Sequence, residues 1–172
     1  EGYLVQNRAL LQRSLELARS QNLIISMDLA SYNVVEDNRQ FLSDMLERYT
    51  DIVFANEAEA MALTGCAPQE AVRALSKYCR IAVVKAGSNG SLVRSGTEEH
   101  SLTAFPARAI DATGAGDLYA AGFLYAHARG LPLQRCGEVA SLVAAKVVEV
   151  IGPRIDSNTW ETLRNSILNY EL

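Results

Sequence analysis

Hydrophobic positions in the first half of the chain alternate between helical spacing and short continuous apolar runs. The helical spacing predicts three amphipathic helices, and each is followed by an apolar run of strand length. The predicted helix and strand pairs are 11–18 with 23–29, 41–49 with 52–55, and 68–78 with 81–84. Alternating helices and buried strands predict a Rossmann-like α/β fold of three layers, α/β/α, with a mostly parallel sheet.

The pattern changes in the second half of the chain. Residues 91–94 and 101–105 are predicted strands on either side of a short polar segment, which indicates a small β-hairpin. Two apolar helices, over 116–128 and 134–150, are expected to close the chain. Because no repeat, low-complexity tract or linker separates these elements, the sequence predicts a single α/β domain over 1–172.

Composition narrows the class of protein. Hydrophobic residues make up 49% of the 172 residues and charged residues 21%, which is the balance of a soluble globular domain. The formal net charge of -4 argues against a nucleic-acid partner. No apolar stretch approaches the roughly 20 residues of a membrane span, and no signal peptide is recognisable. Cys66, Cys79 and Cys136 lack metal or redox spacing, so a cytoplasmic protein is expected.

Polar side chains stand where the three predicted parallel strands end. Asp28, Asn56 and Lys85 each follow the last apolar residues of a strand. Ligands of open α/β sheets bind at the carboxyl edge of the strands. This edge is therefore the expected site for a small anionic ligand.

A glycine-rich turn, Asp111-Ala-Thr-Gly-Ala-Gly-Asp117, leads directly into the first of the closing helices. Backbone N–H groups from Gly114 to Asp117 can converge on one anion there, assisted by the helix dipole. Tyr119 occupies the place of the third glycine of a dinucleotide-binding motif, and the P-loop lysine is absent, so both of those sites are excluded. Asp117 is the candidate general base. The simpler explanation for a lone Asp at this position is that the helix dipole stabilises a carboxylate at the helix N-terminus.

The heptapeptide and the small-residue helix that follows it resemble the C-terminal signature of the ribokinase (PfkB) family of carbohydrate and nucleoside kinases. The resemblance implies a ribokinase-like fold, with Asp117 as catalytic base and the amides of Gly114, Ala115 and Gly116 as an anion hole. Position 112 departs from the pattern, because the family usually has Thr, Ser, Pro or Val there and this chain has Ala112.

Two further segments resemble family elements in the expected order. Asn56-Glu-Ala-Glu59 is similar to an N-x-x-E element that helps to hold Mg²⁺ through water together with the phosphates. Lys85, Gly87 and Gly90 fall in a segment similar to the strand-end loop that lines the nucleotide. Without the resemblance, Asn56 could be a helix cap and Glu59 a solvated helix residue. Lys85 could be a snorkelling surface lysine, and Gly87 and Gly90 could mark a turn before the hairpin.

The resemblance also implies ligands. ATP and Mg²⁺ are the expected cofactors, with Thr113 at the nucleotide, and the carbonyls of Asp111 and Thr113 together with the 151–153 loop imply a monovalent cation such as K⁺. Ala140 stands where many relatives have an Asn that contacts the base. Asp28 is expected only to cap the loop after its strand.

These observations lead to one main hypothesis and two alternatives. The main hypothesis is ATP-dependent transfer of the γ-phosphoryl group to a hydroxymethyl group of a small sugar or nucleoside. Residues 51–57 and the region of Cys136 resemble adenosine kinases. The alternatives are a non-catalytic nucleotide-binding or regulatory protein of the same fold, and an incomplete piece whose partner half is absent.

The second alternative, an incomplete piece, follows from how much of a family member is recognisable. The resemblance covers residues 2 to about 155 and corresponds to the C-terminal part of a relative. The N-terminal part and the lid are not recognisable. In relatives the lid mediates a homodimer, so a homodimer is expected of the full-length protein.

Overall fold

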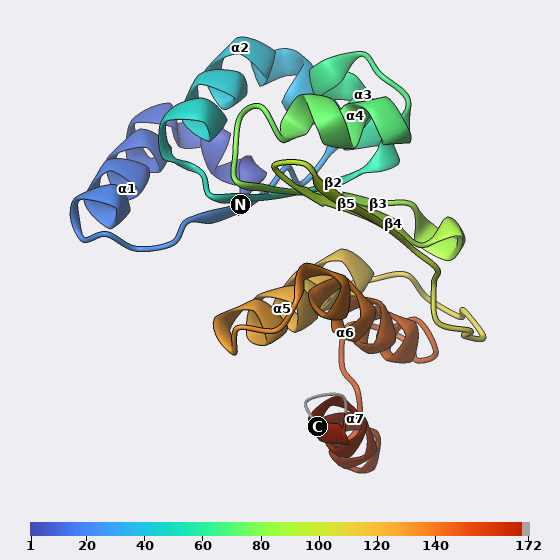
Figure 1. The fold of residues 1–172 in the computed structure, drawn as a ribbon. Coiled ribbons are helices and arrows are strands. Elements are labelled where there is room, and N and C mark those ends of the chain that lie inside the picture. The colour runs from blue at the N-terminus through green and yellow to red at the C-terminus, as the bar shows by residue number, and fades with distance from the viewer. Residues whose placement is uncertain (170–172) are drawn as a thin grey trace. The chain divides into compact units, whose positions relative to one another are not determined.

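The computed structural model describes residues 1–169 and consists of helices with one five-stranded sheet (Figure 1). The helices are α1 Arg8–Ser20, α2 Tyr32–Tyr49, α3 Glu57–Thr64, α4 Pro68–Leu75, α5 Ala115–Ala128, α6 Leu133–Val147 and α7 Ser157–Asn169. The strands are β1 Ser26–Asp28, β2 Ile52–Asn56, β3 Ile81–Lys85, β4 Ser91–Ser95 and β5 Glu98–Leu102. Two short 3₁₀ helices, η1 Gly2–Asn7 and η2 Gly87–Asn89, complete the elements.

The chain divides into two compact units, which are described separately. The first unit comprises residues 1–86 and 92–99, and the second comprises residues 87–91 and those from 100 onward. The single-domain assignment stays a prediction. None of the helices within the described residues is both long and apolar enough to cross a lipid bilayer.

The sheet has the order β1-β2-β3-β4-β5, and its first three strands are parallel. In this register Met27 lies opposite Val53, and Val53 lies opposite Ala82, so the carboxyl ends of the three strands meet at one edge. The α/β fold with a parallel sheet and a small hairpin is confirmed. The hairpin returns earlier than predicted, at 98–102 rather than 101–105, because Gly96, with φ of 57°, allows a tight turn.

The first strand is shorter than the apolar run that predicted it. Leu23 and Ile24 are 56% and 63% exposed, and strand pairing begins only at Ser26, opposite Ile52 at the start of β2. Upstream of that point the chain is still closing α1, since the N–H of Leu23 donates to Ala18 O. The apolar run therefore marks the strand correctly but overstates its length.

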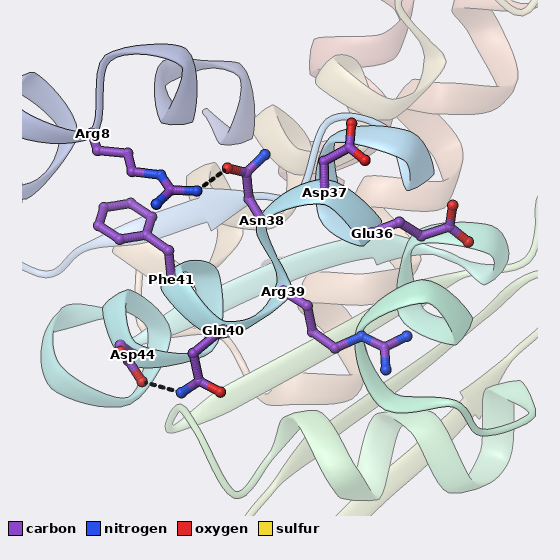
Figure 2. A pocket seen from close by; sticks show the side chains of 8 residues that line it. All are labelled: Arg8, Glu36, Asp37, Asn38, Arg39, Gln40, Phe41 and Asp44. Carbon is purple, nitrogen blue, oxygen red and sulfur yellow. Dashed lines mark hydrogen bonds between the residues drawn. The ribbon is translucent and has the colours of Figure 1, made fainter.

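The helix α2 begins at Tyr32, well before the predicted start at 41, and it is kinked at Asn38, which has φ of -128°. The Asn38 side chain donates to Val34 O and accepts from Arg8, whose guanidinium lies 5.0 Å from the centre of the Phe41 ring. A surface hollow of about 450 Å³ opens beside the kink (Figure 2). None of the predicted site residues lines it.

The second unit centres on α5 and α6, which pack against each other and are joined by a short loop. Gly122 permits their close approach, because a Cβ atom there would lie 3.0 Å from Ala140 Cα. The predicted closing helix 134–150 ends earlier, at Val147. The prediction that it is the last helix is wrong, since α7 follows with a buried Leu163.

Candidate functional site

In the first unit, an ion pair joins the ends of two strands that are not neighbours. Lys85 Nζ at the end of β3 lies 2.6 Å from Asp28 Oδ2 at the end of β1, and the two side chains are 14% and 20% exposed. The other Asp28 oxygen accepts a 3.0 Å hydrogen bond from Ala30 N–H. Asp28 thus caps its loop as predicted, and Lys85 is held by a partner, unlike a snorkelling surface lysine.

Between these two strands, β2 ends at Asn56, which starts α3 with a reciprocal capping box. The N–H of Glu59 donates to Asn56 Oδ1 at 2.9 Å. In return, Glu59 accepts from the Asn56 backbone N–H at 2.7 Å and from Asn56 Nδ2 at 2.6 Å. Asn56 is therefore a helix cap, but Glu59 is only 3% exposed and is not the solvated helix residue of the simpler interpretation.

The electrostatic surroundings of Glu59 connect it to the ion pair. Burial raises the pKa of Glu59, the hydrogen bond from the Asn56 backbone lowers it, the charge of Asp28 raises it and the charge of Lys85 lowers it. Asp28, Lys85 and Glu59 therefore lie close enough at the carboxyl edge of the three parallel strands for their charges to interact, and the charge of Glu1 also raises the pKa of Glu59. This is the edge at which an α/β sheet binds ligands.

In the second unit, the turn before α5 is built around the Asp111 carboxylate. One oxygen accepts from the N–H of Thr113 at 2.9 Å and from its hydroxyl at 2.7 Å, and the other accepts from Gly152 N–H at 2.9 Å. The Thr113 hydroxyl, the Gly152 amide and the Thr113 amide all lower the pKa of Asp111. The Asp111 side chain thus fixes a loop whose carbonyls were predicted to bind a monovalent cation.

The helix α5 starts immediately after this turn, with Gly114 as its N-cap. Gly114 has φ of 79°, and a Cβ atom there would lie 2.6 Å from Pro153 Cβ, so both conformation and space require glycine. The first helical bond is donated by Leu118 N–H to Gly114 O. The amides of Gly116 and Asp117 therefore precede the intrahelical ladder and are suited to bind an anion.

One amide of the predicted anion hole already donates a hydrogen bond within the turn. The N–H of Ala115 donates to Ala112 O at 3.1 Å, which closes the turn. Asp117 is exposed in the first turn of α5. The geometry therefore presents an accessible carboxylate in the first turn of a helix, beside amides that can bind an anion.

The two loop glycines differ in how closely they are packed. Gly90 has φ of 92°, and a Cβ atom there would lie 1.8 Å from Leu102 O, so the hairpin itself requires glycine at this position. Gly87 has φ of 55° and nothing within 4 Å of a Cβ atom. The simpler interpretation as a turn accounts for both glycines, since the left-handed backbone of Gly87 also favours glycine and Gly90 N–H donates to Gly87 O at 3.1 Å. Contact of either glycine with a nucleotide stays a prediction.

The structure brings Lys85, Asn56 and Glu59 together in the first unit and gathers the 111–117 turn in the second. Sequence reasoning missed one partner and one contact. Asp28 was left out of the site because a single strand-end carboxylate looked like a loop cap, and its place two strands from Lys85 is known only from the strand order. The 151–153 loop was expected beside Asp111 from the family resemblance, but the hydrogen bond from Gly152 N–H to the Asp111 side chain depends on tertiary structure.

Comparison with known proteins identifies related kinases. The model of the pfkB family carbohydrate kinase matches residues 4–160. A nucleoside kinase from Methanocaldococcus jannaschii is 31% identical over 138 residues, which is 78% of this chain and 45% of that protein. A nucleoside kinase from Methanothermobacter thermautotrophicus is 36% identical over 138 residues, again 78% of this chain and 42% of that protein. The chain thus spans less than half the length of these curated relatives.

Solved structures agree with the sequence matches. The probable sugar kinase protein from Rhizobium etli superposes with a TM-score of 0.89 at 32% identity, covering 96% of this chain and 52% of that one. Adenosine kinase from Sinorhizobium meliloti gives the same TM-score at 31% identity, covering 96% and 53% of the two chains. The similarity extends over nearly the whole chain and about half of each neighbour.

Proposed function

The chain belongs to the pfkB family of carbohydrate kinases, and from this premise we propose that it carries out ATP-dependent phosphoryl transfer to a hydroxymethyl group of a sugar or nucleoside. The observation that carries the proposal is the start of α5. There a turn fixed by Asp111 and Gly114 presents two amides that precede the helical ladder beside an exposed carboxylate, Asp117. A transferring phosphoryl group needs an anion site and a base of this kind.

The proposed chemistry assigns one step to each group. The Asp117 carboxylate accepts the proton of the attacking hydroxyl group. The oxygen of that hydroxyl forms a bond to the γ-phosphorus, while the bond between the γ-phosphorus and the β-phosphate oxygen breaks. The amides of Gly116 and Asp117 stabilise charge on the phosphoryl oxygens, and Ala115 can join them only by leaving its bond to Ala112 O. Lys85, Gly87, Gly90 and Thr113 are proposed to contact ATP.

The residues present suit a magnesium ion that arrives with the nucleotide. Within residues 1–169 no group of three or more His, Cys, Asp or Glu side chains could hold a metal ion by itself. Mg²⁺ is commonly bound by one or two carboxylates, waters and substrate phosphates, and it neutralises charge between the phosphates. Glu59 has unused oxygen lone pairs that can accept from a water on the ion.

The acceptor is proposed to be a nucleoside or a similarly sized sugar. The two archaeal relatives described above are nucleoside kinases, and one structural neighbour is an adenosine kinase. A screen of ribose, fructose, adenosine and cytidine would separate the two classes. Phosphorylation of sugars but not of nucleosides would assign the acceptor to the sugar class, and phosphorylation of none of the four would contradict the proposal.

The decisive variant is Asp117→Asn. We expect turnover to fall by about 10²- to 10⁴-fold, because the base is lost while the amides remain. The affinity for ATP, measured by calorimetry with magnesium, should change little. Asp156→Asn is the matched control, since Asp156 is likewise an exposed Asp at a helix N-terminus, where it accepts from Thr159 N–H, but lies outside the proposed site. Unchanged turnover in Asp117→Asn would exclude Asp117 as the base.

The non-catalytic alternative makes a different prediction for the unaltered protein. A nucleotide-binding or regulatory protein would show a higher unfolding midpoint with ATP and Mg²⁺, because a ligand that binds only the folded state stabilises it. It would show no product with any acceptor.

Repeating the scan with Na⁺ in place of K⁺ tests the monovalent cation that we propose at the Asp111 and Thr113 carbonyls.

A further inference from the structure

Lys85 is held in place by a residue that the proposed reaction does not use. We propose that Asp28 is a positioning residue, which holds the Lys85 ammonium at the carboxyl edge of the sheet so that the ammonium can contact the phosphate chain of the nucleotide. This inference rests on the proposed function, and it assigns a specific role to Asp28 within it.

The sheet makes the ion pair a bridge over the central strand. Asp28 lies opposite Phe54 of β2 in the strand register, and Lys85 lies opposite Asn56 two residues further along the same strand. The 2.6 Å contact between Lys85 Nζ and Asp28 Oδ2 therefore spans β2 close to the residue that starts α3. The ammonium is thus directed across the end of β2, not along its own strand toward solvent.

Asp28 is itself fixed by the turn that follows β1. Its second oxygen accepts from Ala30 N–H, and Ala30 has φ of 70°, a left-handed conformation that a residue with a Cβ atom rarely adopts. Ser31 N–H donates to Leu29 O across this residue, which closes a three-residue turn. A disfavoured backbone that the surroundings hold in place is typical of sites where geometry matters for function.

The pair is accessible enough to meet a ligand. An ammonium has three N–H donors, and Asp28 accepts from one of them, so two remain for phosphate oxygens. The Lys85 side chain is 14% exposed and that of Asp28 is 20% exposed. A ligand can therefore reach the pair, while burial restricts the movement of the lysine stem. Glu59 lies in the same electrostatic neighbourhood, so a second carboxylate also attracts the ammonium.

A positioning role predicts a particular division between affinity and rate. Asp28 adds negative charge near the phosphates, so the loss of that charge does not by itself weaken ATP binding and offsets the loss of the lysine contact. Releasing the flexible lysine stem, however, removes the ammonium from the place where charge develops during transfer. Misplacement of a catalytic contact by about 1 Å can lower the rate 10²-fold. The expected signature is therefore a lower kcat without a higher KM for ATP.

The test uses Asp28→Asn in the full chain. The Asn side chain keeps an oxygen for Ala30 N–H but loses the charge that faces Lys85. We expect kcat to fall about 10- to 100-fold, with the KM for ATP unchanged or lower and the unfolding midpoint close to that of the wild type. Asp51→Asn is the matched control, because Asp51 pairs with Arg19 near the opposite end of β2 and should leave kcat unchanged.

A second variant shows whether Asp28 acts through Lys85. Lys85→Gln should lower kcat at least as much as Asp28→Asn, and the double variant should be no slower than Lys85→Gln alone. Losses that add in the double variant, or a wild-type kcat in Asp28→Asn, would overturn the proposal. The proposed function fails separately, through wild-type turnover in Asp117→Asn.

Chemical labelling gives a readout that does not require turnover. Acetic anhydride labelling followed by mass spectrometry should show slow acetylation of Lys85 in the wild type and faster acetylation in Asp28→Asn. ATP with Mg²⁺ should slow the labelling of Lys85 in both proteins, while Lys77 serves as the unprotected reference. If ATP does not protect Lys85 in a protein that binds ATP by calorimetry, Lys85 is not at the phosphates and the proposal is wrong.

Discussion

The carboxylate of Asp111 accepts a 2.9 Å hydrogen bond from the backbone N–H of Gly152, 41 residues further along the chain. The same side chain also accepts from the amide and hydroxyl of Thr113, so it joins the turn before α5 to the loop after α6. In Asp111→Asn one acceptor oxygen becomes a donor, and one of these bonds must be lost. We expect faster hydrogen exchange at the amide of Gly152 or of Thr113, whichever faces the new NH₂ group, and a lower unfolding midpoint. Unchanged exchange at both amides would contradict this role.

Gly114 should tolerate no side chain. Gly114→Ala combines an unfavourable left-handed backbone with a contact of 2.6 Å to Pro153 Cβ. Gly130→Ala is the control at the opposite end of α5, because Gly130 has φ of 74° but nothing within 4 Å of a Cβ atom. Urea titration should show a loss of about 1 kcal/mol for Gly130→Ala. For Gly114→Ala the loss should be larger by at least about 1 kcal/mol, and equal losses would show that the contact relaxes freely.

Tyr119 and Ser91 form a buried pair whose hydroxyl groups lie 2.7 Å apart. Tyr119→Phe leaves the Ser91 hydroxyl buried without this partner and should cost about 1 to 3 kcal/mol of unfolding free energy. Adding Ser91→Ala should recover part of that loss, which a double-mutant cycle by urea titration measures. Burial raises the pKa of Tyr119 to about 12, so its phenol should stay neutral in absorbance titrations up to pH 11.

Glu99 makes the stability of the fold depend on pH in the acidic range. It accepts from Arg73 and Arg94, and these hydrogen bonds and charges, that of Arg73 first, lower its pKa from 4.5 to about 2. A carboxylate whose pKa is lowered by folding stabilises the fold. This contribution is fully present above about pH 4.5 and is lost as the pH falls through about 2.

Glu99→Gln should therefore be less stable than the wild type at pH 7, and the difference should shrink between pH 4.5 and pH 2. Urea titrations across this range measure it. High salt should also reduce the difference, because the pairs are partly exposed. Glu47→Gln, on the exposed surface of α2, is the control. A difference that stays constant down to pH 2 would mean that the two arginines do not act through the Glu99 charge.

The strand and helix order could be predicted because burial and periodicity act locally. The runs at 52–55 and 81–84 are continuous because both faces of β2 and β3 are covered, and they were placed within a residue of their true ends. The start of α2 could not be placed, because Asn38 and its polar neighbours interrupt the apolar spacing. The last helix, α7, was missed because its apolar positions are sparse.

The site could be predicted only where its residues are close in sequence. The 111–117 turn is a contiguous pattern, and Asn56 with Glu59 is a four-residue capping signal. The ion pair between Asp28 and Lys85 joins residues 57 apart and depends on a strand order that the sequence does not state. Long-range pairs of this kind require the register of the sheet.

The capping box at the start of α3 has a consequence for any ion that approaches Glu59. Each carboxylate oxygen already accepts a hydrogen bond from Asn56, so an ion bound directly to Glu59 would pull on the same oxygens that hold the first turn of the helix. An ion that keeps its water shell avoids this effect. Inner-sphere binding would fray α3 and outer-sphere binding would leave it intact, so the order of one short helix reports how the metal is held.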